Sequence, residues 1–167
     1  MATWAGVAYV CFIIDAFSRM IVGWRVASHM RTPMVLDAIE MARWSRGDHL
    51  PGLRCHSDAG TQFTSIRYGE RLAEIGAVPL IGSVGDSYRS VNALAETVNG
   101  YYKTELVRGP NQGPWKTIED LELATLGWVH WHNTERLHGY LGDMPPIEFE
   151  NTYYTAVSTP NLLVEIK

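Results

Sequence analysis

A short apolar run that ends in a carboxylate and a glycine is the feature that most constrains the fold of this chain. The run is Leu53-Arg54-Cys55-His56-Ser57, and Asp58 and Gly60 come directly after it. Such a run, bounded by a turn signal, is typical of a buried strand, and Gly60 permits the backbone to turn sharply. Ligands of open α/β sheets bind at the carboxyl ends of the strands. We therefore expect Asp58 to face a crevice.

A second carboxylate and a base share one face of a predicted helix. The segment from Asn92 to Val107 has few helix breakers and contains both Glu96 and Lys103. Their separation of seven residues is nearly two helical turns, so their side chains fall on one stripe. Paired carboxylates beside a base predict metal-assisted chemistry on nucleic-acid phosphates.

The other patterns predict an antiparallel hairpin followed by alternating helices and strands. Val7 to Ile14 and Ile21 to Ala27 are rich in β-branched and aromatic residues, and the polar segment Asp15 to Arg19 joins them. Thr117 is followed by acidic residues, which predicts a capped helix start. We expect helices over 32–44, 64–75, 92–107 and 117–132, strands over 53–57 and 78–81, and a loop over 82–91.

Several motifs occur in a characteristic order along the chain. His56-Ser57-Asp58-Ala59-Gly60-Thr61-Gln62-Phe63 is followed by Asn92-Ala93-Leu94-Ala95-Glu96 and then by Lys103. An Asp-x-x-Ser-Arg segment at 15–19 precedes them, and an Asn-x-x-Arg-x-His segment at 133–138 follows them. Together they resemble the catalytic core of DDE transposases and retroviral-type integrases, particularly the insertion-sequence 3 group.

The resemblance implies an α/β fold of the ribonuclease H-like class, a mixed sheet flanked by helices. It places an integrase-like catalytic core over residues 1–150, incomplete at the N-terminus, and a C-terminal tail over 151–167. The family's first, central strand carries the first of three catalytic carboxylates, and Met1-Ala2-Thr3-Trp4 offers no acid there. Asp15 matches a different position. Without that strand, we expect its two neighbours either to close on each other or to leave the fold marginal.

The same resemblance assigns roles to individual residues. Asp58 and Glu96 would coordinate Mg²⁺ or Mn²⁺, hard cations that prefer oxygen ligands. Lys103 would contact a DNA phosphate, and Gln62 and Asn92 would form hydrogen bonds around the site. The plainer interpretations are a turn Asp, a solvated helix Glu, an exposed Lys and two turn-capping amides.

Two further segments carry expectations of their own. Arg89-Ser90-Val91 stands where the family has a single acidic residue, and we expect the extra residues to fall in a loop. Arg19 is expected to pair with Asp15, and the alternative is that it approaches DNA. Arg136 and His138 are expected to pack near the C-terminus, and the alternative is that they close a hydrogen-bond network around the site.

Composition limits the partners that the chain can hold alone. Its net charge of -4 and pI of about 5.8 argue against an independent DNA binder, because counterion release requires clustered Lys and Arg. The resemblance implies that an upstream helix-turn-helix region or a companion protein, and a homodimer, bring DNA to the core. The tryptophans at 4, 24, 128 and 131 fall in apolar patterns, which predicts core packing.

The function that follows is a transposase core that cleaves DNA and joins strands, impaired by the missing carboxylate. Two alternatives stay open: a non-catalytic ribonuclease H-like fragment that binds DNA or a partner chain, and a metal-dependent nuclease of the same fold. The longest apolar run, Val7 to Ile14, is far below the roughly 20 residues that cross a bilayer. We expect a protein of the bacterial cytosol or nucleoid, with no membrane partner.

Overall fold

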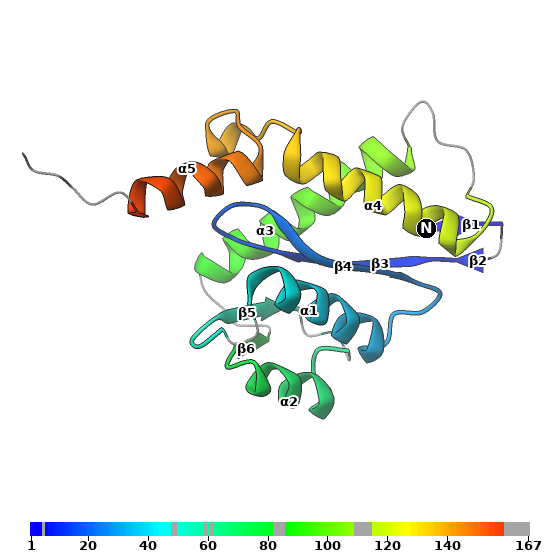
Figure 1. The fold of residues 1–167 in the computed structure, drawn as a ribbon. Helices are drawn as coiled ribbons and strands as arrows, with labels where there is room; N and C mark the ends of the chain where they lie inside the picture. The colour runs from blue at the N-terminus through cyan, green and yellow to red at the C-terminus, as the bar shows by residue number, and fades with distance from the viewer. Residues whose placement is uncertain are drawn as a thin grey trace, which may run out of the picture.

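The computed structural model describes residues 1–4, 6–47, 50–58, 60, 62–81, 86–108 and 115–158, with backbone alone at 2, 86–91 and 158. In this part of the chain, three two-stranded sheets are flanked by helices (Figure 1). None of the described helices is long and apolar enough to span a bilayer. The α/β class predicted from the sequence is confirmed.

A long antiparallel hairpin lies in the middle of the molecule (Figure 1). Strands β3 (Tyr9–Ile14) and β4 (Ile21–Ala27) pair in register from Tyr9 opposite Ala27 to Ile13 opposite Gly23, with an irregularity at Ile14. The predicted hairpin is confirmed, but its first strand begins later than expected. The preceding strand β2 (Gly6–Val7) pairs with β1 (Ala2–Thr3) instead.

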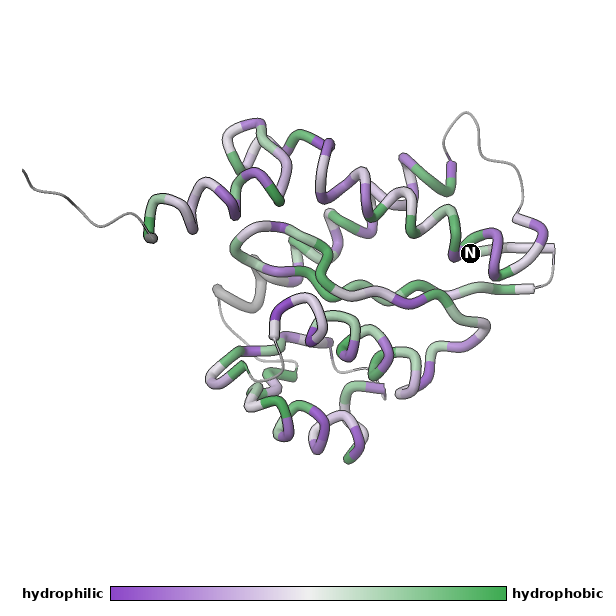
Figure 2. The backbone as a smooth tube through the Cα atoms, viewed as in Figure 1, coloured by the Kyte–Doolittle hydropathy of each residue, from purple (hydrophilic) through white to green (hydrophobic). Residues whose placement is uncertain are grey.

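Helices cover both faces of this hairpin. Helix α1 (Thr32–Arg46) lies against β4, where a Cβ added at Gly23 would lie 2.9 Å from the backbone nitrogen of Ala42. Helix α4 (Ile118–Thr134) lies on the opposite face (Figure 1). Figure 2 shows the hydrophobic residues of the hairpin lying between the two helical layers.

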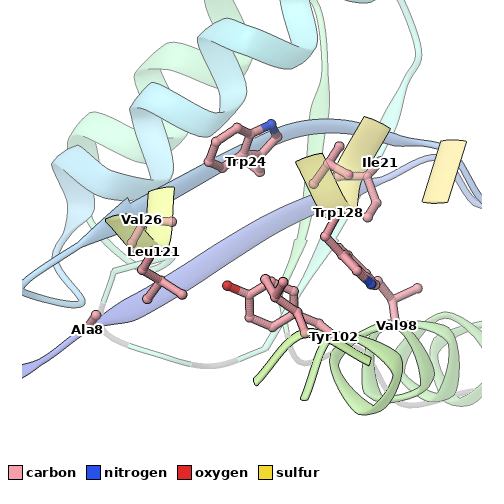
Figure 3. Close-up of a cluster of buried hydrophobic side chains, with 10 residues drawn as sticks. Ala8, Ile21, Trp24, Val26, Val98, Tyr102, Leu121 and Trp128 are labelled. Carbon is pink, nitrogen blue, oxygen red and sulfur yellow. The ribbon is translucent and has the colours of Figure 1, made fainter. Parts of the chain in front are cut away.

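The first core cluster is aromatic. Figure 3 shows Tyr102 and Trp128 beneath the hairpin; their ring centroids are 5.1 Å apart, and Phe12 of β3 lies 5.1 Å from Tyr102. The Tyr102 hydroxyl lies 2.7 Å from the buried Thr125 hydroxyl. Helix α4 therefore packs through rings whose polar atoms are paired, as buried aromatic residues require.

A parallel pair of strands forms the second sheet. Strands β5 (Arg54–Ser57) and β6 (Val78–Ile81) pair from Arg54 opposite Val78 to Ser57 opposite Ile81. Helix α2 (Ile66–Glu74) makes the crossover between them; Ser65 caps its start. Its C-terminal end is followed by Gly76 at φ 77°, a left-handed conformation that favours glycine. A second cluster packs this layer onto α1: Val35, Ile39, Tyr68, Leu72, Ile75 and Ala77.

The predicted loop over 82–91 is wrong from Asp86 onward. Helix α3 (Asp86–Tyr101) includes Arg89-Ser90-Val91, so the extra residues lie in a helix and not in a loop. The stretch contains no proline and no glycine before Gly100, and helix formation is therefore not interrupted locally. Residues 82–85 and the expected break at 109–114 lie outside the described residues.

The chain continues through less regular helices. A π-helical turn, η1 (Tyr102–Val107), extends α3, and a capping box at Thr117 opens α4 as predicted. A 3-10 turn, η2 (Gly139–Leu141), precedes α5 (Pro146–Ser158). The predicted boundary between core and tail at residue 150 falls inside α5.

Of the two expected outcomes, direct pairing of the two strands is not seen among the described residues, and the other, a marginal fold, stays a prediction. Strand β3 pairs with β4 and β5 pairs with β6, and no described ladder joins β3 to β5. The two strands instead border a common cavity. Within the described residues, β3 and β5 therefore belong to separate two-stranded sheets.

Candidate active site

The cavity between β3 and β5 is the candidate active site. Its volume is about 430 Å³. Strand β3, the carboxyl end of β5, one face of α3 and parts of α1 and α2 contribute to its walls. The polar side chains that line it are those of His56, Ser57, Asp58, Gln62, Tyr68, Asn92, Glu96 and Asn99.

Asp58 occupies the end of β5, at the crevice where the sequence predicts it. Its side chain is exposed, and its Oδ1 accepts a hydrogen bond of 2.9 Å from the backbone N–H of Gly60. A Cβ at Gly60 would lie 2.8 Å from that oxygen and 2.6 Å from Nε2 of Gln62. Only glycine lets the turn approach the carboxylate this closely, so Gly60 fixes one oxygen and leaves the other available.

Glu96 reaches the same cavity from α3. Its Oε1 accepts a hydrogen bond of 3.0 Å from Nδ2 of Asn92, one helical turn earlier. Asn92 and Glu96 are both exposed and both line the cavity. The structure therefore brings Asp58 and Glu96 to one cleft from separate elements, with Asn92 orienting the second carboxylate.

Gln62 ties the Asp58 turn to two helices. Its backbone carbonyl accepts hydrogen bonds from the hydroxyls of Thr32 at 3.5 Å and Ser65 at 3.2 Å. Its Nε2 lies 3.8 Å from the sulfur of Met30 at the rim of the cavity. The backbone of Gln62 thus positions the turn, while its amide faces the cleft.

Lys103 lines a neighbouring cavity of about 580 Å³ that also includes Glu96 and Asn99. It lies in the π-helical turn η1 and is exposed. The two cavities share Val10 and Met30 in addition to the α3 residues. The lysine and the glutamate therefore face continuous space, as their spacing in the sequence predicts.

The thiols of Cys11 and Cys55 line the floor of the cleft. Burial, together with the nearby Cys55 and Asp58, raises the pKa of the Cys11 thiol to about 12. Burial also raises the pKa of Cys55, whose sulfur lies 3.3 Å from the Tyr68 hydroxyl. Both raised pKa values favour the protonated thiols near neutral pH, so neither cysteine is an activated thiolate.

The donor set was tested against a divalent cation. Asp58 and Glu96 offer hard carboxylate oxygens, which fit Mg²⁺ or Mn²⁺. The Nδ1 atom of His56, buried at the cleft wall, has no hydrogen-bond partner among the described residues. No group of three or more metal-binding side chains converges in the described part of the chain. The site thus fits a cation through two carboxylates.

Three expectations about single residues are wrong, those for Arg19, Trp4 and Trp131. Arg19 does not pair with Asp15, whose carboxylate binds Arg46 at 3.1 Å. The guanidinium of Arg19 stacks on Tyr140 instead, 3.9 Å from the ring centroid. Trp4 is 73% exposed, because β1 pairs with β2 at the margin of the molecule. Trp24 and Trp128 are buried as predicted, and Trp131 is 37% exposed.

Comparison with known proteins adds independent findings. The family model described as "Integrase core domain" matches residues 1–87, and a second of the same description matches 84–146. A Mycobacterium tuberculosis relative named for insertion sequence element IS986/IS6110 is 55% identical over 96% of this chain and 58% of its own length. The transposase for insertion sequence element IS629 of Shigella sonnei is 46% identical over 97% of this chain and 52% of its own.

A solved structure shares the fold. The catalytic core domain of BIV integrase superposes with a TM-score of 0.64 at 19% identity, over 90% of this chain and 91% of that one. At this identity the likeness concerns the fold alone, and it confirms the ribonuclease H-like class. The chain spans slightly more than half the length of the two sequence relatives.

Proposed function

We propose that this chain, which belongs to the integrase core family, acts as a transposase catalytic core that cleaves and joins DNA strands at the cleft between β3 and β5. The observation that carries the proposal is the meeting of Asp58 and Glu96. They come from a strand end and a helix, and both line one cavity. Each is also held by a neighbour, Gly60 or Asn92.

The two carboxylates would hold Mg²⁺ or Mn²⁺. Such a cation, when bound, stabilises the entering and leaving oxygens of an in-line displacement at phosphorus. The N–H of Gly60 and the amide of Asn92 each occupy one carboxylate oxygen, which points the other toward the ligand. These contacts reduce the freedom that the side chains would lose on binding.

DNA would lie along α3 beside the carboxylates. Lys103 would contact a phosphate as a point charge, and the amides of Gln62 and Asn92 would form hydrogen bonds with the DNA or with the metal ligands. Lys103 opens onto the cavity that also contains Glu96, which supports this assignment. A phosphate between the lysine and the cation would be neutralised from two sides.

Affinity for DNA would come partly from elsewhere. The net charge of -4 opposes strong binding to a polyanion. We therefore propose that a helix-turn-helix region or a companion protein, together with homodimerisation, holds the transposon ends and target on this core. The setting would be the bacterial cytosol or nucleoid, where that DNA lies.

Calorimetric titration with Mn²⁺ tests the proposal. Asp58→Asn and Glu96→Gln should each weaken Mn²⁺ binding at least tenfold, since each removes a charged ligand. Glu70→Gln is the matched control, because Glu70 is exposed on α2 and does not line the cavity. Equal Mn²⁺ affinity in all four proteins would contradict the proposal.

Assays on DNA separate the possible activities. With Mn²⁺ and a DNA end, strand-transfer product that disappears in Asp58→Asn would establish the transposase reaction. Cleavage without joining would indicate a nuclease of the same fold. DNA binding by the parent chain without either product, unchanged in Asp58→Asn, would indicate a binding fragment.

A further inference from the structure

A second, smaller cavity lies on the other side of α3 from the carboxylate cleft. Its volume is about 250 Å³. The floor is formed by Ala93, Leu94, Thr97 and Val98 of α3, and the walls by Arg19, Tyr101, His138, Gly139 and Tyr140. Pockets for drug-sized ligands are about 300 to 1,000 Å³, so this one suits a single flat group.

The Asn-x-x-Arg-x-His segment supports the walls of this cavity. Asn133 exchanges two hydrogen bonds of 2.9 Å with the backbone of Ile21 and fixes the hairpin end to α4. Arg136 pairs with Glu105 at 2.9 Å and lies 3.8 Å from the Tyr101 ring centroid. The segment therefore holds the cavity walls, although none of these contacts serves Asp58 or Glu96.

Arg19 is the cation that this arrangement presents. It adopts φ 64°, a left-handed conformation that is uncommon for a residue with a side chain, and its carbonyl lies 3.3 Å from Nε2 of His132. Its guanidinium stacks on Tyr140 and has no ion-pair partner within the described residues. Arg46 and Arg136, by contrast, are both bound to carboxylates. The turn thus holds an arginine in place without neutralising it.

Tyr140 supplies an exposed aromatic surface beside that charge. Its side chain is 77% exposed, which is unusual for a large ring in a wall held by so many contacts. Unpaired bases of nucleic acids stack on aromatic rings and on guanidinium planes, and Arg also binds phosphate. An apolar floor, a ring and an unpaired cation are the features that one nucleotide requires.

We propose that this cavity binds an unpaired nucleobase of single-stranded DNA, stacked against Tyr140, with the adjoining phosphate on Arg19. The ligand class rests on the proposed function, because a DNA substrate is taken from it. Ala93 and Thr97 of the floor flank the helical turn that carries Glu96. A strand crossing α3 would then place one base here and a neighbouring phosphate at the carboxylates.

Fluorescence anisotropy with a short labelled oligothymidine, in EDTA, tests this pocket without the metal site. Tyr140→Ala should weaken single-strand binding about tenfold, in keeping with the loss of one stacked base, whereas Tyr140→Phe should retain it. Arg19→Ala should also weaken binding and reduce its salt dependence. The duplex of the same sequence should bind Tyr140→Ala and the parent chain alike.

A matched control exists on α1. Trp44 is also 77% exposed and has Arg43 5.6 Å from its ring centroid, but Arg43 is held by Glu40 at 3.2 Å and Trp44 does not line this cavity. Trp44→Ala should bind oligothymidine like the parent. If Tyr140→Ala binds oligothymidine as tightly as Trp44→Ala does, the proposed base-binding pocket is contradicted.

Tyr140→Ala separates the two proposals. It should bind Mn²⁺ like the parent chain, because Tyr140 does not line the carboxylate cavity. If the parent chain binds no oligothymidine in EDTA, the pocket is overturned, while Mn²⁺ titration continues to test the catalytic cleft independently.

Discussion

The hairpin layer and the β5–β6 layer differ in how firmly they are held. Strand β4 is buried at five of its seven residues, whereas β5 has none in that class and Val78 of β6 is 49% exposed. The hairpin carries helices on both faces, and the aromatic cluster joins it to α3 and α4. Asp58 lies on the other layer. One of the two carboxylates is thus placed on the less buried layer, an arrangement typical of functional elements.

The largest expected effect comes from the core of the hairpin layer. Trp128→Ala should lower the free energy of unfolding by about 3 to 5 kcal/mol, because it removes a ring that packs on Tyr102 and leaves a cavity. Urea denaturation followed by circular dichroism measures this. Trp44→Ala, at an exposed ring, should change it by less than about 0.5 kcal/mol. Equal losses in the two variants would remove the distinction between core and surface drawn above.

Acid should destabilise the same layer through His132. Burial first, then His138 and Arg136, lowers the pKa of His132 from 6.5 to about 4. Above pH 6.5, His132 is neutral in both states and does not change the stability. As the pH falls from 6.5 toward 4, the unfolded state binds the proton first, so the free energy of unfolding decreases. Below pH 4, both states are protonated at this residue and the decrease stops. The total loss in the free energy of unfolding due to His132 is on the order of 3 kcal/mol.

Denaturation at several pH values, on the parent chain and on His132→Gln, measures this contribution. The variant should lose the decline between pH 6.5 and 4 that His132 causes. A variant that retained the full slope would assign it to other groups, such as His138, whose pKa burial also lowers.

Two glycines provide a direct comparison of the layers. Gly23→Ala should destabilise by about 1 to 3 kcal/mol, because its Cβ would press on the backbone of α1 at Ala38 and Ala42. Gly69→Ala in α2 meets nothing within 4 Å and should stabilise by about 0.5 to 1 kcal/mol through helix propensity. Thermal midpoints of the two variants should move in opposite directions. Destabilisation by Gly69→Ala would show that α2 is packed more tightly than its surroundings indicate.

Local patterns predicted most of the elements in both layers. The hairpin, the Thr117 capping box and β6 follow from β-branched runs and short-range hydrogen bonding, which depend on neighbours in sequence. The helix over Arg89-Ser90-Val91 was missed because a comparison with the family suggested an insertion, while the residues themselves permit a helix.

Contacts between distant residues account for what the sequence did not predict. The Asp58 crevice and the shared face of Glu96 and Lys103 follow from strand ends and helical period. The stacking of Arg19 on Tyr140 joins residues far apart in the chain, and no local pattern predicts it. The only sequence feature that pointed to this region was the Asn-x-x-Arg-x-His motif at 133–138, which has no role in the cleft.

The last comparison of the two layers concerns the opening of the cleft itself. Cys11 lies on β3 and Cys55 on β5, and both side chains are partly buried at its floor. If the β5–β6 layer opens without the hairpin, Cys55 should react with a thiol reagent about tenfold faster than Cys11, since local opening costs less than global unfolding. Labelling of Cys11→Ser and Cys55→Ser at one pH isolates each thiol. Similar rates that both follow the global free energy of unfolding would mean that the two layers open together, and the carboxylates of the cleft would then be as firmly held as the hairpin that they face.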